Sequence, residues 1–182
     1  SMIAVIMSER PSSFSLKLIN AIEERAVQQN DSILLYHTGA DVKREMVAIS
    51  QAIEHRVKGI LFLPVMGSEE KTVELLKKAE KEEIPVVLLD WDLYKEDFDC
   101  VCLDNKKIIY DGATLLFEEG HHRIAFISCP EVAKEGEQRK DGYIQCLRDR
   151  EIPLMEEYQY AGQFDEQSGY EACQKFFSLP KP

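Results

Sequence analysis

Three side chains in this sequence are of the types that recognise polar small molecules. Asp90 closes the apolar run Val86–Leu89, and Trp91 follows it directly. A carboxylate at that place can accept hydrogen bonds from two hydroxyls, and an indole offers a flat apolar face. Arg139 lies near the start of a predicted helix, in the segment EGEQRKDGY, and brings several hydrogen-bond donors. Taken singly, such an acid is usually solvated or caps a helix, and such an arginine usually lies on the surface.

The motifs of common catalytic and nucleotide-binding sites are missing from the sequence. After the first predicted strand, residues Ser8–Phe14 contain no glycine, so no G-x-G-x-x-G dinucleotide motif is present. Neither a P-loop nor a G-x-S-x-G nucleophile elbow occurs. A response regulator would combine an acidic pair after the first strand with an accepting aspartate such as Asp90, but Ser8-Glu9 fits that pattern poorly. We therefore expect neither enzymatic activity nor a cofactor.

Two adjacent histidines, His121 and His122, follow Gly120 and suggest a metal site at first sight. Neighbouring side chains on a turn point in different directions, and no acid stands beside them at the spacing of a metal ligand. Gly120 instead suits the left-handed residue that ends many helices. We predict a helix stop here and no metal site.

Composition and charge exclude several classes of protein. The 182 residues carry a formal net charge of −11, which repels phosphate backbones and makes the chain alone a poor nucleic-acid binder. No run approaches the roughly 18 apolar residues of a membrane span. Five cysteines without C-x-x-C spacing indicate small buried side chains in a reducing cytosol. No basic region or cleavage site precedes the first predicted strand, which leaves the targeting of a longer protein open. The cysteines favour a cytoplasmic protein, and we expect no membrane contact.

Short apolar runs alternate with helical patterns along the whole chain. The predicted strands are Ile3–Met7, Ile33–His37, Gly59–Leu63, Val86–Asp90, Cys100–Leu103, Ile124–Ser128 and Glu157–Tyr160. The predicted helices are Phe14–Gln29, Lys43–His55, Ser68–Glu82, Lys106–Glu119, Glu137–Arg148 and Gln167–Phe177. This alternation favours an α/β fold with doubly wound parallel sheets, each covered by helices on both faces.

Two local patterns refine the predicted helices. In the first helix, an apolar face is predicted from residues that recur at helical spacing, namely Leu16, Ile19, Ile22, Ala26 and Val27. Ser68 supplies a hydroxyl N-cap for the third helix.

A polar and aromatic connection, Trp91–Asp99, separates two groups of strand–helix units. We place a boundary near Asp97–Asp99, which gives an N-terminal lobe over residues 1–98 and a C-terminal lobe over residues 99–182. In open α/β sheets, ligands bind beyond the carboxyl ends of the strands, and Asp90 lies at such an end.

Seven segments, in order along the chain, resemble the effector-binding domain of LacI/GalR-type transcriptional regulators. They are IAVIMSERPSSFSLKLINAIEERA, HTGADVKREMVAISQAIEHRVKGILFLP, IPVVLLD, DCVCLDN, GHHRIAFISCP, QRKDGY and AGQFDEQSGYEA. The resemblance implies a two-lobed, periplasmic-binding-protein-like fold of type I, with a small-molecule effector in the cleft between the lobes.

The resemblance also implies which residues contact the effector. Phe14 matches an aromatic residue at the start of the first helix, and Asp90 matches an acid at the end of a strand that many members use to bind sugar hydroxyls. Trp91 is shared with the purine repressor, in which the same strand also ends in Asp-Trp. Arg139 matches the arginine of an R-x-x-G-[YF] signature, and Phe164 an aromatic that stacks on the ligand from the second lobe. An aromatic set with a carboxylate and a guanidinium suits a polyhydroxylated ring.

Departures from the family pattern narrow the ligand. The positions with which the purine repressor reads its base are Ala133 and Glu135 here, so the groups that would read a purine edge are absent. Phe14-Ser15 replaces a pair of aromatics and leaves a wider, more polar site. We therefore expect a sugar or sugar-like effector, with Glu135 binding an amine or hydroxyls unless it is simply a solvated loop acid.

The sequence stops at Leu179-Pro180-Lys181-Pro182, where the family continues through another strand and completes both lobes. The second lobe is therefore expected to be incomplete. Phe176 or Phe177 should then lack neighbours, and an open sheet edge should remain.

The function implied by the resemblance is that of an effector-sensing domain in a cytoplasmic repressor. Effector binding would control operator binding through a helix-turn-helix headpiece that this sequence does not contain, in a homodimer. The alternative is an extracytoplasmic sugar-binding protein that feeds an ABC transporter. An upstream helix-turn-helix would favour the first, and a signal peptide the second.

Overall fold

The computed structural model describes residues 1–7, 13–39, 41–64, 70–90, 97–130, 134–163 and 165–180, and of residues 134 and 135 only the backbone. The chain forms two compact units, Ser1–Cys102 and Leu103–Pro182. We call them unit 1 and unit 2 and describe each by itself.

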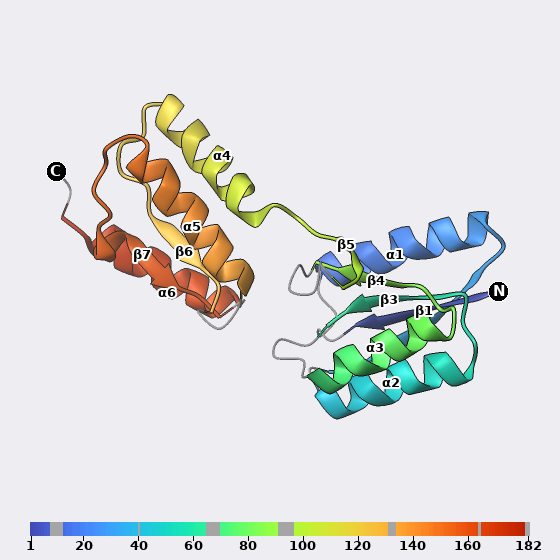
Figure 1. Cartoon of the computed structure of the whole chain (residues 1–182). Coiled ribbons are helices and arrows are strands. Elements are labelled where there is room, and N and C mark those ends of the chain that lie inside the picture. Colours follow the sequence, from blue (N-terminus) through green and yellow to red (C-terminus); the bar gives the residue numbers. More distant parts are fainter. Residues whose placement is uncertain are drawn as a thin grey trace. The chain divides into compact units, whose positions relative to one another are not determined.

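Unit 1 is built on a sheet of five parallel strands in the order β2-β1-β3-β4-β5 (Figure 1). The strands are β1 (Met2–Met7), β2 (Ser32–His37), β3 (Gly59–Leu63), β4 (Val86–Leu89) and β5 (Asp99–Val101). The helices between them are α1 (Ser13–Gln28), α2 (Val42–Glu54) and α3 (Glu70–Lys81). The predicted α/β fold with a parallel sheet is confirmed.

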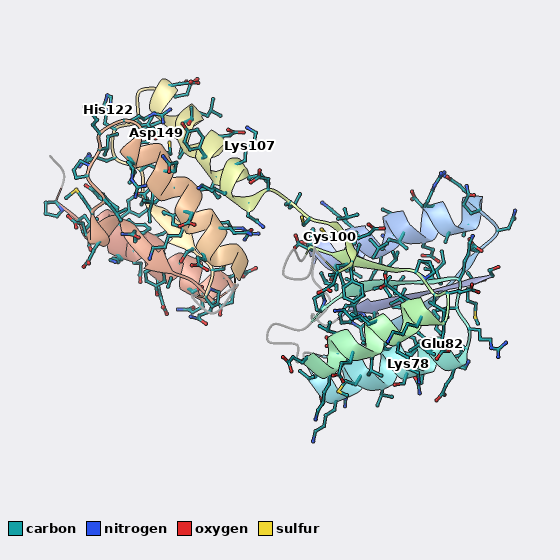
Figure 2. All side chains as sticks on the ribbon, in the orientation of Figure 1. Lys78, Glu82, Cys100, Lys107, His122 and Asp149 are labelled. Atoms are coloured by element: carbon teal, nitrogen blue, oxygen red, sulfur yellow. The ribbon has the colours of Figure 1, made fainter. Side chains whose placement is uncertain are left out.

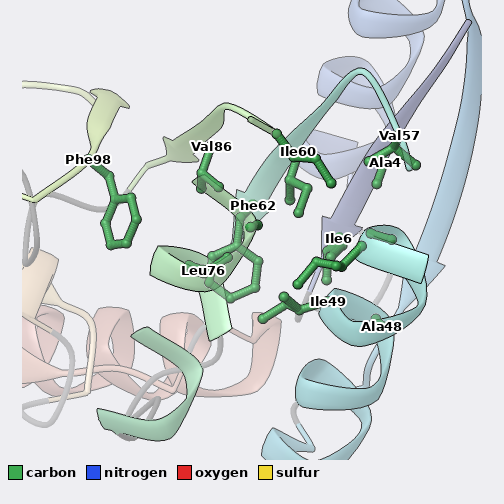
Figure 3. Packing of buried hydrophobic residues seen from close by; sticks show 14 of the residues in the cluster. Ala4, Ile6, Ala48, Ile49, Val57, Ile60, Phe62, Leu76, Val86 and Phe98 are labelled. Atoms are coloured by element: carbon green, nitrogen blue, oxygen red, sulfur yellow. The ribbon is translucent and has the colours of Figure 1, made fainter. Parts of the chain in front are cut away.

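Helices cover both faces of this sheet because successive strand residues point to opposite sides. Ala4 and Ile6 pack with residues of α2 and α3, whereas Val5 and Met7 pack towards α1. The face towards α2 and α3 holds the larger cluster, in which Phe62 is fully buried (Figure 3). Strands covered on both faces are apolar throughout, which is why their runs stood out in the sequence.

Unit 2 contains α4 (Asn105–Glu118), β6 (Phe126–Ser128), α5 (Lys134–Arg148), a short 3-10 helix (Glu156–Tyr158), β7 (Gln159–Ala161) and α6 (Glu166–Ser178). Its sheet has two parallel strands, β6 and β7. The core is small, with Phe126, Tyr143 and Leu147 buried at its centre. Phe177 is 87% exposed, as predicted for the last helix.

The turn after α4 has the predicted geometry. Gly120 adopts a left-handed φ of 88°, which suits a residue without Cβ. Its N–H donates to the carbonyl of Phe117, and the N–H of His121 donates to the carbonyl of Leu116, both at 3.0 Å. This pair of bonds is a Schellman motif, and it confirms the predicted helix stop.

Several local predictions differ from the structure. The first helix buries Ser15 and Ala26, whereas Leu16 and Val27 are exposed, so the predicted apolar face was wrong at both of its ends. Cys102 and Cys173 are exposed rather than buried. The predicted Ser68 cap lies outside the described residues.

The strand assignments differ mainly next to the boundary between the units and in unit 2. β5 pairs with β4, so the first unit extends to Cys102, beyond the expected boundary near Asp97–Asp99. The strand expected from Ile124 begins at Phe126. Where a strand over Glu157–Tyr160 was expected, a 3-10 turn comes first and the strand is Gln159–Ala161.

Candidate functional site

Asp90 lies where β4 ends and the chain turns. Its φ is +53°, in the left-handed region, which aspartate tolerates better than most residues. Its backbone N–H donates to the carbonyl of Val101 at 2.8 Å, so pairing with the neighbouring strand ends at this turn. The predicted strand therefore ends at Leu89, and the half-buried carboxylate stands at the carboxyl edge of the sheet. Trp91 lies outside the described residues.

Phe14 is the second residue of α1, and its side chain is 46% exposed. The adjacent Ser15 is fully buried, so the helix presents Phe14 to solvent. Since α1 follows the carboxyl end of β1, Phe14 and Asp90 belong to the same edge of the parallel sheet in unit 1. This is the edge at which open α/β sheets bind ligands.

Arg139 belongs to unit 2 and is held by a residue that the sequence did not single out as part of the site. The Nε–H of Arg139 donates to Oδ1 of Asn105 at 2.8 Å. Asn105 begins α4 and is only 5% exposed. Its Nδ2 lies 3.5 Å from Oε1 of Gln138, on the residue before Arg139. The guanidinium is therefore tied to the first turn of the neighbouring helix.

The R-x-x-G-Y signature puts three residues on one face of α5, because residues three and four apart share a helix face. A Cβ on Gly142 would overlap the carbonyl oxygen of Lys106, so α5 passes very close to the start of α4. The Tyr143 hydroxyl donates to the carbonyl of Ile124 at 2.8 Å, and its ring stacks on Phe126 at 5.0 Å. Gly142 and Tyr143 thus fix the helix that carries Arg139.

Asp104 and Asn105 divide two tasks at the start of α4. Oδ1 of Asp104 accepts the backbone N–H of Lys107 at 2.9 Å and caps the helix. Asn105 accepts from Arg139 instead. Both residues lie in the segment DCVCLDN, which carries part of the family resemblance, but no site role was predicted for Asn105. The available signal was an amide side chain beside a cap, together with the Arg139 signature.

For two further predicted site residues, Phe164 and Glu135, the structure does not describe the side chain. Phe164 lies outside the described residues, and only the backbone of Glu135, in α5, is described. The chain on either side of Phe164 is anchored. The N–H of Gln163 donates to Oγ of Ser168 at 2.9 Å, and Asp165 caps α6 by accepting the N–H of Ser168 at 2.8 Å. This backbone hydrogen bond lowers the pKa of Asp165.

A groove of about 330 Å³ opens elsewhere in unit 1, where β2 ends and α2 begins. Tyr36, Lys43 and Arg44 are among its lining residues. None of the predicted site residues lines it. The sequence gave no indication of this groove.

In the part of the chain that the structure describes, no group of three or more His, Cys, Asp or Glu side chains could hold a metal ion. Figure 2 shows His122 near the far end of α4, where the side chain is exposed. No helix in the described ranges is both long and apolar enough to cross a membrane.

Known proteins are similar to this chain along its whole length. The family described as periplasmic binding proteins and sugar binding domain of the LacI family matches residues 1–182. The HTH-type transcriptional repressor PurR of Klebsiella pneumoniae subsp. pneumoniae is 27% identical over 177 residues, which cover 97% of this chain and 51% of the repressor. The chain thus spans about half the length of the curated relatives it matches.

Solved structures share the fold. The transcription regulator CcpA of Lactococcus lactis matches with a TM-score of 0.79 and 20% identity, over 97% of this chain and 64% of that one. A periplasmic binding protein/LacI transcriptional regulator from Alkaliphilus metalliredigens QYMF, complexed with D-xylulofuranose, matches with a TM-score of 0.70 and 22% identity. That match covers 90% of this chain and 57% of the other. At these identities the likeness concerns the fold alone.

Proposed function

Because the chain belongs to the family of periplasmic binding proteins and sugar-binding domains of the LacI family, we propose that it senses a sugar or sugar-like effector within a transcriptional repressor. The observation that carries this proposal is the family match over the whole of residues 1–182. The match includes the segment in which Arg139 is held by Asn105. Unit 1 would be the N-terminal lobe of the sensing domain, and unit 2 a part of the C-terminal lobe.

Each proposed contact has a physical reason. Phe14, Trp91 and Phe164 would stack on the apolar faces of a sugar ring. Asp90 and Glu135 would accept hydrogen bonds from its hydroxyls, and Arg139 would donate to its oxygens. The exposure of Phe14 and the place of Asp90 at the sheet edge support these roles.

The remaining parts of the function concern the longer protein. With a net charge of −11, the chain itself is unsuited to bind DNA, so operator binding would need a separate headpiece. Effector binding would then shift the balance between operator-binding and released states of a cytoplasmic homodimer. This coupling requires the effector to bind one state more tightly than the other.

The alternative function is that of an extracytoplasmic sugar-binding protein for an ABC transporter. The family description includes periplasmic binding proteins as well as regulators. The curated relative is a repressor and the L. lactis neighbour is a regulator by name, which favours the sensing role.

A thermal-shift panel on the chain tests the effector class. It contains D-xylulose, D-ribose and D-glucose, with hypoxanthine and guanine as the competing class. We expect at least one carbohydrate to raise the melting temperature, because a ligand that binds only the folded state stabilises it. A response to the nucleobases and to none of the carbohydrates would contradict the proposal.

Arg139→Ala in the full-length sensor tests the proposed donor. The loss of a charged hydrogen bond costs about 1.5–3 kcal/mol, so affinity for the responding sugar should fall by about 10- to 100-fold in calorimetry. Arg148→Ala is the matched control, because Arg148 is an exposed arginine on the same helix. Equal affinities for the two variants would remove Arg139 from the site.

A further inference from the structure

We propose that Asn105 is a positioning residue, which fixes the Arg139 guanidinium so that it meets the effector with its two terminal nitrogens. The inference rests on the proposed function, because it assumes that Arg139 donates to the effector. Its basis is the 2.8 Å bond from Nε of Arg139 to Oδ1 of Asn105, between residues 34 positions apart.

The chemistry of the pair determines the orientation of the amide. Arginine can only donate hydrogen bonds, so the atom of Asn105 that faces Nε must be the oxygen. The amide nitrogen of Asn105 then points to Oε1 of Gln138, 3.5 Å away. An asparagine can serve both neighbours because it carries an acceptor and a donor on one planar group. Its burial, at 5% exposure, shields this arrangement from competing water.

The bond depends on how closely the two helices approach. Gly142 lies three residues after Arg139, on the same face of α5. Its missing Cβ lets the carbonyl of Lys106 come within a distance that any larger residue would block. Since Lys106 follows Asn105 directly, the contact at Gly142 also sets the distance between Asn105 and Arg139. The glycine and the asparagine therefore act together.

The consequence for recognition follows from the donors that remain. A guanidinium has five N–H groups, and the bond to Asn105 uses the one on Nε. Among the described residues, neither Nη1 nor Nη2 of Arg139 has a hydrogen-bond partner. Their parallel N–H groups can donate to two oxygens at once. We therefore expect an effector that offers paired oxygens, such as vicinal hydroxyls or a carboxylate.

The test follows the Nε–H proton of Arg139 by NMR in the chain without any ligand. In the unaltered chain the proton should exchange slowly with water, because it is bonded to a buried oxygen. In Asn105→Ala the exchange should become at least about tenfold faster. Asn105→Asp should restore slow exchange, since a carboxylate also accepts the bond. Lys140→Ala, which changes an exposed neighbour on α5, is the control and should leave the exchange slow.

Fast exchange in the unaltered chain, or equally slow exchange in Asn105→Ala, would overturn the positioning role. If Asn105→Ala does not fold, Asn105→Asp decides, because fast exchange there would also overturn it. A loss of helix packing alone would not be restored by a carboxylate. As the readout needs no ligand, failure of the sugar panel would remove the proposed function and leave this result standing.

Discussion

Units 1 and 2 use the same alternation of strand and helix, but they bury very different amounts of apolar surface. In unit 1, five adjacent strands give each covering helix a broad surface, and residues Ala4 to Met7 of β1 are fully buried. In unit 2, two strands offer a narrow surface, and apolar side chains on α4 and α6, such as Leu115 and Phe177, stay exposed. The size of the sheet, more than the pattern of the sequence, sets how much each helix can bury.

The difference extends to the proposed contacts. In unit 1, Phe14 and Asp90 are placed by the edge of the sheet, through the start of a helix and a left-handed turn. In unit 2, Arg139 is placed by two helices in close contact, through Asn105 and Gly142. The smaller unit thus relies on specific polar and steric contacts where the larger one relies on its sheet. Substitutions in the core of unit 1 and at the helix contacts of unit 2 test this difference between the two units.

The largest effect is expected from Phe62→Ala in the core of unit 1. Removal of a fully buried phenylalanine should lower the free energy of unfolding by about 3–5 kcal/mol. Urea unfolding followed by hydrogen exchange with peptide resolution would locate the loss in unit 1. Phe177→Ala in unit 2 removes a side chain that is 87% exposed, and should change stability by less than about 0.5 kcal/mol. Similar losses for both variants would break the contrast.

Next in size is Gly142→Ala in unit 2. The new Cβ would overlap the carbonyl of Lys106 and push α5 away from α4, at a cost of about 1–3 kcal/mol. The matched control is Gly112→Ala in α4, where no heavy atom lies within 4 Å of the added Cβ. That change should stabilise the unit by about 0.5–1 kcal/mol, because alanine favours a helix. In chemical denaturation, Gly142→Ala should therefore lower the free energy of unfolding, and Gly112→Ala should raise it.

The helix caps allow the same chemical change in both units. Asp41 caps α2 in unit 1, where its Oδ1 accepts the N–H of Lys43 at 2.8 Å, and Asp104 caps α4 in unit 2. Substitution of either by alanine should cost about 1 kcal/mol. Because unit 2 has the smaller core, the substitution at Asp104 should raise the hydrogen-exchange rates of backbone amides throughout unit 2 more than the substitution at Asp41 raises them in unit 1. A larger rise of the exchange rates in unit 1 would contradict the expectation that unit 2 is the less stable unit.

The smallest effect on stability is expected from Asp31→Asn in unit 1, and it depends on pH in the acid range. Lys58 donates to Asp31 at 2.6 Å, and this hydrogen bond lowers the pKa of Asp31. A lowered folded-state pKa contributes stability that is fully present above the unfolded value, about 3.9. That stability is lost as the pH falls through the lower folded value. Asp31→Asn should therefore narrow the difference in urea midpoint between pH 6 and pH 3, and an unchanged difference would contradict the assignment.

Much of unit 1 was predictable from the sequence, and the reasons for the errors are physical. Its strands are continuous apolar runs, so their limits fell within one or two residues of the structure. In α1, apolar residues occur on more than one face, and the sheet selects the stripe that contains Ser15, Leu18 and Ile22. No local pattern distinguishes that stripe from the one that contains Leu16 and Val27.

The candidate site was predictable in part. The family resemblance predicts contacts from Phe14, Asp90 and Arg139, and these contacts stay predictions; the structure shows only that Phe14 is exposed, that Asp90 lies in a left-handed turn and that Arg139 donates to Asn105. Asn105 was missed because its bond joins two helices 34 residues apart, and hydrogen bonds at such separation depend on the fold. The close approach at Gly142 is likewise invisible until the helices are packed.

The most direct test of the account is an NMR titration of the chain with D-xylulose, D-ribose and, as the competing class, hypoxanthine, followed at the backbone amides and at Nε of Arg139. The account predicts that a sugar shifts the signals of residues next to Phe14, Asp90 and Arg139 in a saturable way. Shifts confined to the groove near Tyr36 and Lys43, or produced only by nucleobases, would contradict it.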